Sequence, residues 1–211
     1  YGNVCIGATK LKASIIGNLI PTINSRLDDM YSNIVSGDEW NDVLDPTNEI
    51  LFHRKADGTI FFEILYQNNT KRSSDSFFLN SVDSAMLEKN RNAVAGAVHI
   101  CFHGFGGGSC RGQELGRTNR NDLRMSGGKI FYETISMKTK SKHVKTPRCL
   151  PPCIVRRVMI ALVLYSGGDD GELFDLNFDQ LDEGVGKTYA DVFGLTHQLG
   201  FQLSRQLYAC I

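Results

Sequence analysis

Apolar residues recur every third or fourth position between residues 9 and 35, and this periodicity constrains the fold more than any other feature. Such spacing covers one face of a helix, so the segment predicts a helix whose stripe faces a core. Pro21 lies inside the stripe, and because proline lacks an N–H and clashes with the preceding turn, we expect it to kink or split the helix. The stripe consists of Leu11, Ile15, Ile16, Leu19, Ile20, Ile23, Leu27, Met30, Tyr31 and Ile34.

The period changes to that of β-strands after this segment. Residues 49–69 read EILFHRKADGTIFFEILYQNN, and the two apolar runs around a turn at 56–58 predict a hairpin. A short helix is expected at 83–92. Four further runs with strand-like composition predict additional strands, and they cover residues 76–80, 95–103, 129–137 and 157–165.

The chain closes on a second helical stripe, which predicts an amphipathic helix over residues 188–208. Most predicted strands follow one another directly, without helices between them, so neighbouring strands are expected to pair antiparallel. We therefore expect an α+β fold with a largely antiparallel sheet, an N-terminal helical segment and a C-terminal amphipathic helix, in a single domain over 1–211. The stripe of the closing helix consists of Val192, Leu195, Leu199, Leu203 and Leu207.

Composition places the chain among ordinary globular proteins. It has 211 residues with a formal net charge of zero, and no apolar run approaches the roughly 18 residues that a membrane-spanning helix needs. Six scattered cysteines do not match a disulfide-rich scaffold, which favours reduced thiols. We expect a soluble protein, more in keeping with an intracellular setting, with no membrane partner and no cofactor; the compartment is not identified.

Residues 98–117, VHICFHGFGGGSCRGQELGR, hold the most chemically suggestive stretch of the sequence. One interpretation is a Gly-rich turn with an incidental cysteine, in which residues 104–108 form an exposed loop because four glycines in five positions destabilise a strand. The alternative is a catalytic turn in which Cys110 is a nucleophile and a histidine is its base.

Two resemblances support the catalytic alternative. HGFGGG resembles the oxyanion loop of α/β-hydrolases, and the segment 108–112 is similar to their nucleophile elbow with cysteine in place of serine. That resemblance implies Cys110 as nucleophile, Asp169 as the acid and His197 as the base. SCRGQEL is similar to the caspase signature, which implies Cys110 acting with His103.

Phosphate and metal motifs are incomplete. Gly186, Lys187 and Thr188 match the end of a phosphate-binding P-loop, but Leu181 stands where its first glycine belongs. A glycine turn before the last helix is therefore the favoured interpretation.

A zinc site would need closely spaced pairs of ligands. Two candidate sets lack such pairs: Cys101 and His103 with Cys110, and His143 with Cys149 and Cys153. We therefore predict no metal site.

Charge is strongly segregated along the chain. Residues 138–157 contain seven basic residues and no acidic one, and residues 169–183 contain seven acidic residues and no basic one. We expect the first segment to bind a protein partner or a second copy through charge complementarity, with nucleic acid or a phosphate ligand as a less supported option, since no aromatic residue is present there to stack on bases. The predicted binding residues are Lys138, Lys140, Lys142, Lys145, Arg148, Arg156 and Arg157.

A further resemblance agrees with assembly. GRTNRNDLRMSGGKIFYETISMK, followed by RRVMIALVLYSGGDDG, looks like strands of small viral jelly-roll capsid proteins. The leading hypothesis is therefore a non-catalytic binding or assembly module, which includes a viral or other self-assembling structural protein. A hydrolase that uses Cys110 is the alternative.

Overall fold

A computed structural model describes most of the chain. The described residues are 2–6, 9–37, 39–57, 59–74, 81–106, 118–126, 128–136, 144–165, 173–174, 176–195, 200–201 and 206. Its strands are β1 (Asn3–Ile6), β2 (Thr9–Lys12), β3 (Glu49–Arg54), β4 (Ile60–Leu65), β5 (Lys71–Ser73), β6 (Arg124–Ser126), β7 (Lys129–Ser136) and β8 (Val144–Cys149). Its helices are α1 (Ala13–Gly17), α2 (Leu19–Ile34), α3 (Glu39–Leu44), α5 (Ser84–Phe105), the 3₁₀ turn η1 (Arg120–Asp122), α7 (Pro152–Leu164) and α8 (Phe178–Phe193).

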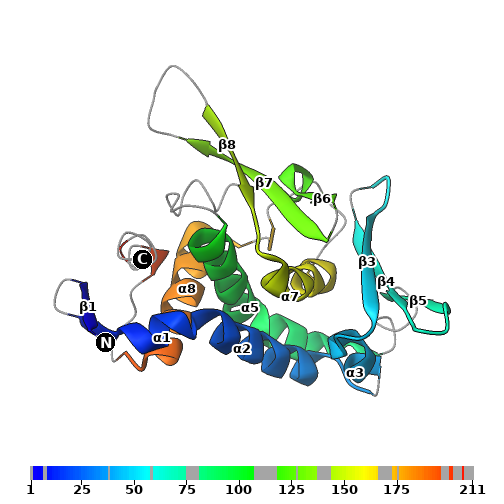
Figure 1. The fold of residues 1–211 in the computed structure, drawn as a ribbon, viewed down its shortest axis with the longest axis horizontal. Helices are drawn as coiled ribbons and strands as arrows, with labels where there is room; N and C mark the ends of the chain where they lie inside the picture. The colour runs from blue at the N-terminus through cyan, green and yellow to red at the C-terminus, as the bar shows by residue number, and fades with distance from the viewer. Residues whose placement is uncertain are drawn as a thin grey trace.

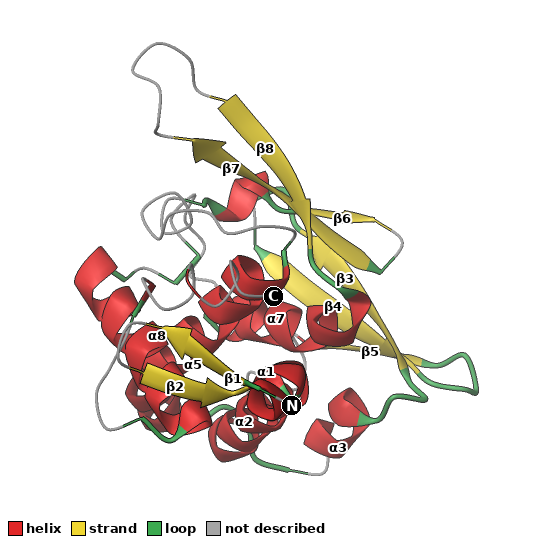
Figure 2. Cartoon of the chain, turned by 60° about the vertical axis from the view of Figure 1, so that its left-hand side comes forward, coloured by secondary structure: helices red, strands yellow, loops and turns green. Residues whose placement is uncertain are grey.

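The strands form three antiparallel sheets, ordered β1-β2, β3-β4-β5 and β6-β7-β8 (Figure 2). The expected α+β class, with antiparallel strands and a C-terminal amphipathic helix, is confirmed. The hairpin predicted at 49–69 is also present, and its turn is closed by the Lys55 N–H, which donates to the Thr59 carbonyl at 2.8 Å. The strand predicted at 129–137 is β7.

Helices α2, α5, α7 and α8 pack together as the body of the molecule, and the two three-stranded sheets lie beside it (Figure 1). Their buried apolar side chains belong to one core cluster. Helix α5 packs against the other three helices. Where it crosses α8, a Cβ on Gly96 would overlap the Gly184 carbonyl, so glycine is required for the two backbones to approach this closely.

Two predicted strands are wrong. Residues 95–103 lie inside helix α5, and residues 157–165 belong to α7 and its last turn. Each segment is a nearly unbroken apolar run, and a helix buried on all sides has no polar face to mark its period, so such a run fits a buried strand equally well. The helix predicted at 83–92 is the start of α5, where the Asp83 side chain caps the N–H groups of Ala85 and Met86.

The boundaries of both terminal helical segments also differ from the prediction. The first segment begins as strand β2, and its helices are divided at Asn18, while Pro21 lies in the first turn of α2, where a missing N–H costs no hydrogen bond. Helix α8 begins ten residues before the predicted 188, and the described residues Phe201 and Gln206, within the predicted range, are also helical. Helix α8 starts at the Asn177 capping box and ends before Gly194, whose φ of 63° stops it. The predicted strand at 76–80 and Leu199 lie outside the described residues.

The glycine-rich stretch does not begin as an exposed loop. Gly104 lies within α5, and Gly106 is its buried C-cap, against the hydroxyl of Tyr132. The prediction of an exposed loop is therefore wrong at Gly104 and Gly106, and Gly107 and Gly108 lie outside the described residues. Strand β7 leaves no room for a side chain at this helix end.

Candidate functional site

The most distinctive surface feature is the β7–β8 hairpin, which projects away from the helical body (Figures 1 and 2). Its base is anchored to the body. Ile130, Tyr132 and Thr134 alternate along β7 and are buried, and the Tyr132 hydroxyl donates to the Phe102 carbonyl of α5 at 2.6 Å. The alternation typical of a half-buried strand therefore attaches this part of the hairpin to the helices.

This hairpin region is strongly cationic. Residues 124–149 contain seven lysines and arginines and one carboxylate, Glu133. Arg124 and Lys129 are exposed at the base, and Arg148 is half-buried on β8, where its Nε donates to the Thr134 hydroxyl at 2.9 Å. Lys145 lies on β8 opposite Ile135.

Three of the predicted binding residues, Lys138, Lys140 and Lys142, lie outside the described residues. They belong in sequence to the segment that connects Ser136 with Val144, which are paired across the two strands. The connection between the hairpin strands therefore carries three positive charges.

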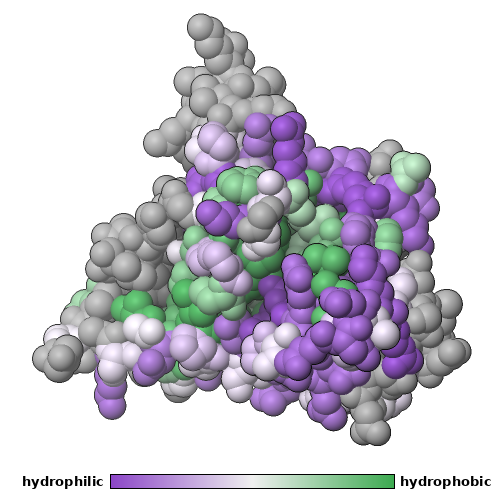
Figure 3. All heavy atoms as spheres, turned by 45° about the vertical axis from the view of Figure 1, so that its right-hand side comes forward, coloured by the Kyte–Doolittle hydropathy of each residue, from purple (hydrophilic) through white to green (hydrophobic). Residues whose placement is uncertain are grey.

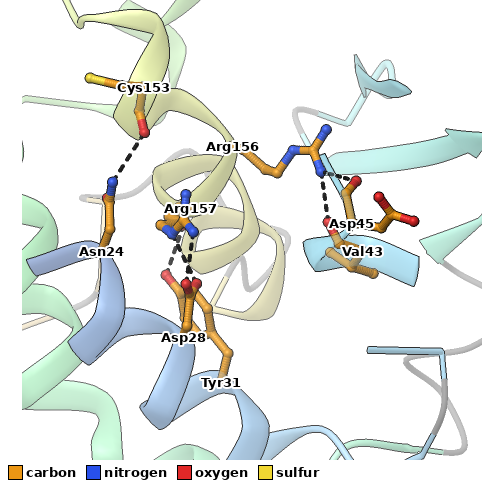
Figure 4. A network of polar contacts seen from close by, with 8 residues as sticks. All are labelled: Asn24, Asp28, Tyr31, Val43, Asp45, Cys153, Arg156 and Arg157. Carbon is orange, nitrogen blue, oxygen red and sulfur yellow. Dashed lines mark hydrogen bonds and ion pairs between the residues drawn. The ribbon is translucent and has the colours of Figure 1, made fainter. Parts of the chain in front are cut away.

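The other two predicted binding residues have structural roles. On α7, Arg157 forms a two-bonded ion pair with Asp28 of α2, with Nε to Oδ1 at 2.9 Å and Nη2 to Oδ2 at 2.7 Å (Figure 4). The backbone carbonyl of Arg157 also accepts a hydrogen bond from the fully buried Tyr31 hydroxyl at 2.7 Å. Burial raises the pKa of Tyr31 well above its usual value, so it remains a donor here.

Arg156 points to the opposite side of α7 and holds the loop after α3 (Figure 4). Its Nη1 donates to the carbonyls of Val43 and Asp45, at 3.0 and 2.8 Å, and its Nη2 donates to that of Asn48 at 2.7 Å. Burial is the main cause that lowers its pKa. Both arginines thus connect α7 to other parts of the chain through intramolecular hydrogen bonds.

The histidines of the glycine-rich stretch lie inside the protein. His103 is fully buried on α5 and packs against Phe201, and His99, one turn earlier, lies beside Phe174 and Phe201. Burial lowers the pKa of His99 to about 4, so it is neutral near pH 7. Burial likewise raises the pKa of Cys101 to about 12, which makes this thiol a poor nucleophile.

Only His103 of the predicted catalytic residues is described. Cys110, Asp169 and His197 lie outside the described residues, and the catalytic set stays a prediction. His103 reaches no solvent, and a base that activates a nucleophile must reach both that group and the substrate.

The acidic segment is described only in part. Asp179, Asp182 and Glu183 lie on the first turns of α8, and Asp182 accepts a hydrogen bond from the Phe201 N–H at 2.7 Å.

The P-loop-like residues 186–188 are in the middle of this helix, where the Thr188 hydroxyl donates to the Gly184 carbonyl at 2.8 Å. The expected glycine turn before the helix is therefore wrong, and a helix interior cannot wrap a phosphate as a loop does.

Across the described ranges, no cluster of three or more metal-ligating side chains is found. Within the same ranges, no helix has the length and apolarity needed to cross a membrane. The described cysteines, Cys5, Cys101, Cys149 and Cys153, are all free thiols.

Sequence reasoning missed a groove that opens between β3 and the β6–β7 turn. It has a volume of about 390 Å³ at the end that includes Pro152 and Arg156 and about 260 Å³ at the end that includes Met125 and Lys129. No motif could reveal this groove, because its walls come from three parts of the chain that are distant in sequence.

No protein-family model matches this chain, and no curated protein or solved structure matches it either. The function proposed below is therefore argued from the geometry and charge of the chain itself.

Proposed function

We propose that this chain is a non-catalytic binding module that engages double-stranded nucleic acid through the β7–β8 hairpin. The observation that carries the proposal is a projecting two-stranded ribbon whose region, 124–149, holds seven cations against one carboxylate. A ribbon of two strands fits the major groove of a duplex, and lysines and arginines neutralise phosphates and release counterions.

The composition of the hairpin favours a duplex over a single strand. Proteins that hold single strands stack successive bases on several aromatic side chains. The connection at 137–143 contains no Phe, Tyr or Trp, and the described part of the hairpin exposes one, Phe131. Lysines, by contrast, bind the regularly spaced phosphates of a duplex without reading its sequence. We therefore expect affinity with little sequence preference.

The basic segment was predicted to extend through Arg157, but Arg156 and Arg157 are held by intramolecular contacts. The binding surface is accordingly restricted to the hairpin and its base. The competing hypothesis is that the hairpin binds the acidic segment 169–183 of a second copy, and the test below separates the two. No described residue supports the alternative of a Cys110 hydrolase.

The test measures fluorescence anisotropy of a labelled 20-base-pair DNA duplex over a series of salt concentrations. The variant is Lys138→Gln/Lys140→Gln/Lys142→Gln, and its matched control, Lys12→Gln/Lys89→Gln/Lys187→Gln, removes three exposed lysines from other elements. We expect micromolar binding at low salt, and the hairpin variant should reduce the slope of log affinity against log salt by about 2 to 3. The control should reduce it by less than about 1.

The proposal is overturned if the duplex does not bind at low salt, or if both triple variants bind it alike. In the first case, light scattering can also detect self-association at low salt that the hairpin variant abolishes. The partner would then be the acidic segment of a second copy.

A further inference from the structure

The groove beside β3 adjoins the base of the hairpin, with which it shares Lys129, and lies along an edge of a sheet that no described strand covers. Strand β3 pairs only with β4 among the described residues, and five consecutive residues, 49–53, line the groove. Side chains of consecutive strand residues point to opposite faces, so a cavity lined by all five runs along the strand's edge. Consistently, β4 alternates between buried and half-buried residues, whereas Ile50 to Arg54 are all half-buried.

The register identifies which backbone groups face the groove. The Lys55 N–H donates to Thr59, so residues 55 and 59 form a hydrogen-bonded pair, and such pairs recur at every second position of an antiparallel ladder. Residue pairs 53–61 and 51–63 therefore exchange hydrogen bonds, while the N–H and C=O groups of Ile50 and Phe52 point to the outer edge. The Phe62 N–H, opposite Phe52, indeed points away from β3 and donates to the Ser74 hydroxyl at 3.0 Å.

The outward groups of Ile50 and Phe52 have no hydrogen-bond partner among the described residues. Four free backbone groups in a row, two donors and two acceptors, are complementary to another extended strand. A rounded ligand could not reproduce this alternating spacing.

The floor of the groove is apolar. Ile50 and Phe52 share the body-facing side of β3 with the buried residues of β4, and Met125 and Val155 lie across from them. The space-filling view turned toward this side shows hydrophobic residues gathered in the middle and hydrophilic ones around them (Figure 3). A bound strand would therefore place apolar side chains at alternate positions.

One end of the groove is closed. The Arg54 guanidinium joins β3 to the residues before β6, donating to the carbonyls of Arg120 and Leu123 at 2.6 and 3.1 Å and to Asn121 Oδ1 at 2.9 Å. The end at Glu49 is open toward the loop after α3. The free edge is thus limited to about five residues, or roughly 17 Å of extended chain.

Opposite charges mark the two regions of the groove. Glu49 is exposed at the open end, where the other charged lining residue, Arg156, already donates to three backbone carbonyls. Lys129 is exposed beside the β6–β7 turn, which borders the part nearer His53. A strand that continues the antiparallel pattern would have its C-terminal end beside Glu49. Charge complementarity therefore asks for a basic residue at that end and an acidic residue at the other.

We propose that this groove binds an extended segment of a partner protein as an added antiparallel strand on β3, with apolar side chains at alternate positions, an acidic residue at its N-terminal end and a basic residue at its C-terminal end. Main-chain hydrogen bonds to Ile50 and Phe52 give an affinity that does not depend on the partner's sequence. The partner's side chains that contact Met125 and Val155 give the specificity.

The probe is the capped peptide Asp-Val-Thr-Val-Thr-Val-Arg, titrated into ¹⁵N-labelled protein. We expect saturable shifts of the Ile50 and Phe52 amide signals. The same peptide with N-methylated valines cannot donate to the carbonyls of Ile50 and Phe52, and its methyl groups would clash with the β3 edge, so it should bind at least tenfold more weakly. Saturation that is absent up to millimolar peptide, or equal binding of the methylated peptide, overturns the proposal.

Two variants test the edge itself. Ile50→Pro and Ile50→Ala both remove the side chain, but only proline also removes the outward N–H, and an N–H that faces away from the ladder is one that an edge strand can lose. With both variants confirmed as folded by circular dichroism, Ile50→Pro should bind at least fivefold more weakly than Ile50→Ala. Equal affinities would overturn the backbone pairing.

Charge is tested separately with Glu49→Lys/Lys129→Glu, which reverses both ends of the groove and should come to prefer the peptide in which Asp and Arg are exchanged. An unchanged preference would show that the charges at the two ends do not set the direction of the peptide.

Self-association is tested without peptide. Concentration-dependent shifts of the Ile50 and Phe52 amide signals would overturn the proposal, because a second copy of the chain would then occupy the groove.

Discussion

Arg157 and Asp28 form a parallel, two-bonded ion pair that joins α7 to α2, and each side chain is 24% exposed. Asp28→Ala leaves the guanidinium partly buried without its carboxylate, so we expect a loss of about 2 kcal/mol in the free energy of unfolding, measured by urea titration. The more exposed pair Arg26–Asp191 provides the control, and Asp191→Ala should cost less than about 1 kcal/mol. Equal losses would show that the two-bonded pair has no special role.

Gly96→Ala should destabilise the protein by at least about 2 kcal/mol, because its Cβ would overlap the backbone of Gly184 and force α5 and α8 apart. Gly104→Ala is the matched control in the same helix. Nothing lies within 4 Å of a Cβ at that position, so alanine should be neutral or stabilise by up to about 1 kcal/mol. Thermal unfolding of both variants measures the difference, and a tolerated alanine at 96 would contradict the close helix crossing.

His99 should make the protein less stable in acid. Burial lowers its pKa in the folded state to about 4, below the 6.5 of an unfolded histidine, so between these values the unfolded chain binds the extra proton. The stability contributed by the neutral ring is complete above pH 6.5 and declines as the pH falls toward 4, by about 3 kcal/mol in total.

His99→Phe cannot take up a proton, and its ring can pack against the same neighbours, Phe174 and Phe201. Urea titrations at several values between pH 7.5 and 4.5 should give a smaller decline for this variant than for the wild type. Parallel curves would mean that His99 does not titrate on unfolding.

Cysteine alkylation tests the remaining catalytic alternative. Iodoacetamide should modify the exposed Cys5 and Cys153 in the native protein but spare Cys101, because burial raises its pKa to about 12 and excludes the reagent. If the chain is not a hydrolase, Cys110 should react as an ordinary thiol, with a rate that increases toward pH 8.5. Peptide mass spectrometry measures each site, and rapid modification of Cys110 well below pH 7 would instead favour a catalytic thiolate.

Local patterns in the sequence were sufficient for the β3–β4 hairpin and for β7. A strand with one buried face alternates apolar and polar residues, and this two-residue period is visible in the sequence. The turn is also local, because the Asp57 side chain accepts the Thr59 N–H at 2.9 Å. The charge segregation was likewise visible without a structure. These features depend on residues that are close in the sequence, so the sequence alone determines them.

Tertiary packing decided what local patterns left ambiguous. The run that includes Val98 is helical because α2, α7 and α8 surround it, and apolar residues around the whole circumference remove the period that distinguishes helix from strand. Packing also directed Arg156 and Arg157 to carbonyls and a carboxylate far away in sequence, although their charges suggested an external ligand. The groove arises only where β3, the β6–β7 turn and α7 meet, because long-range contacts decide which edges stay open.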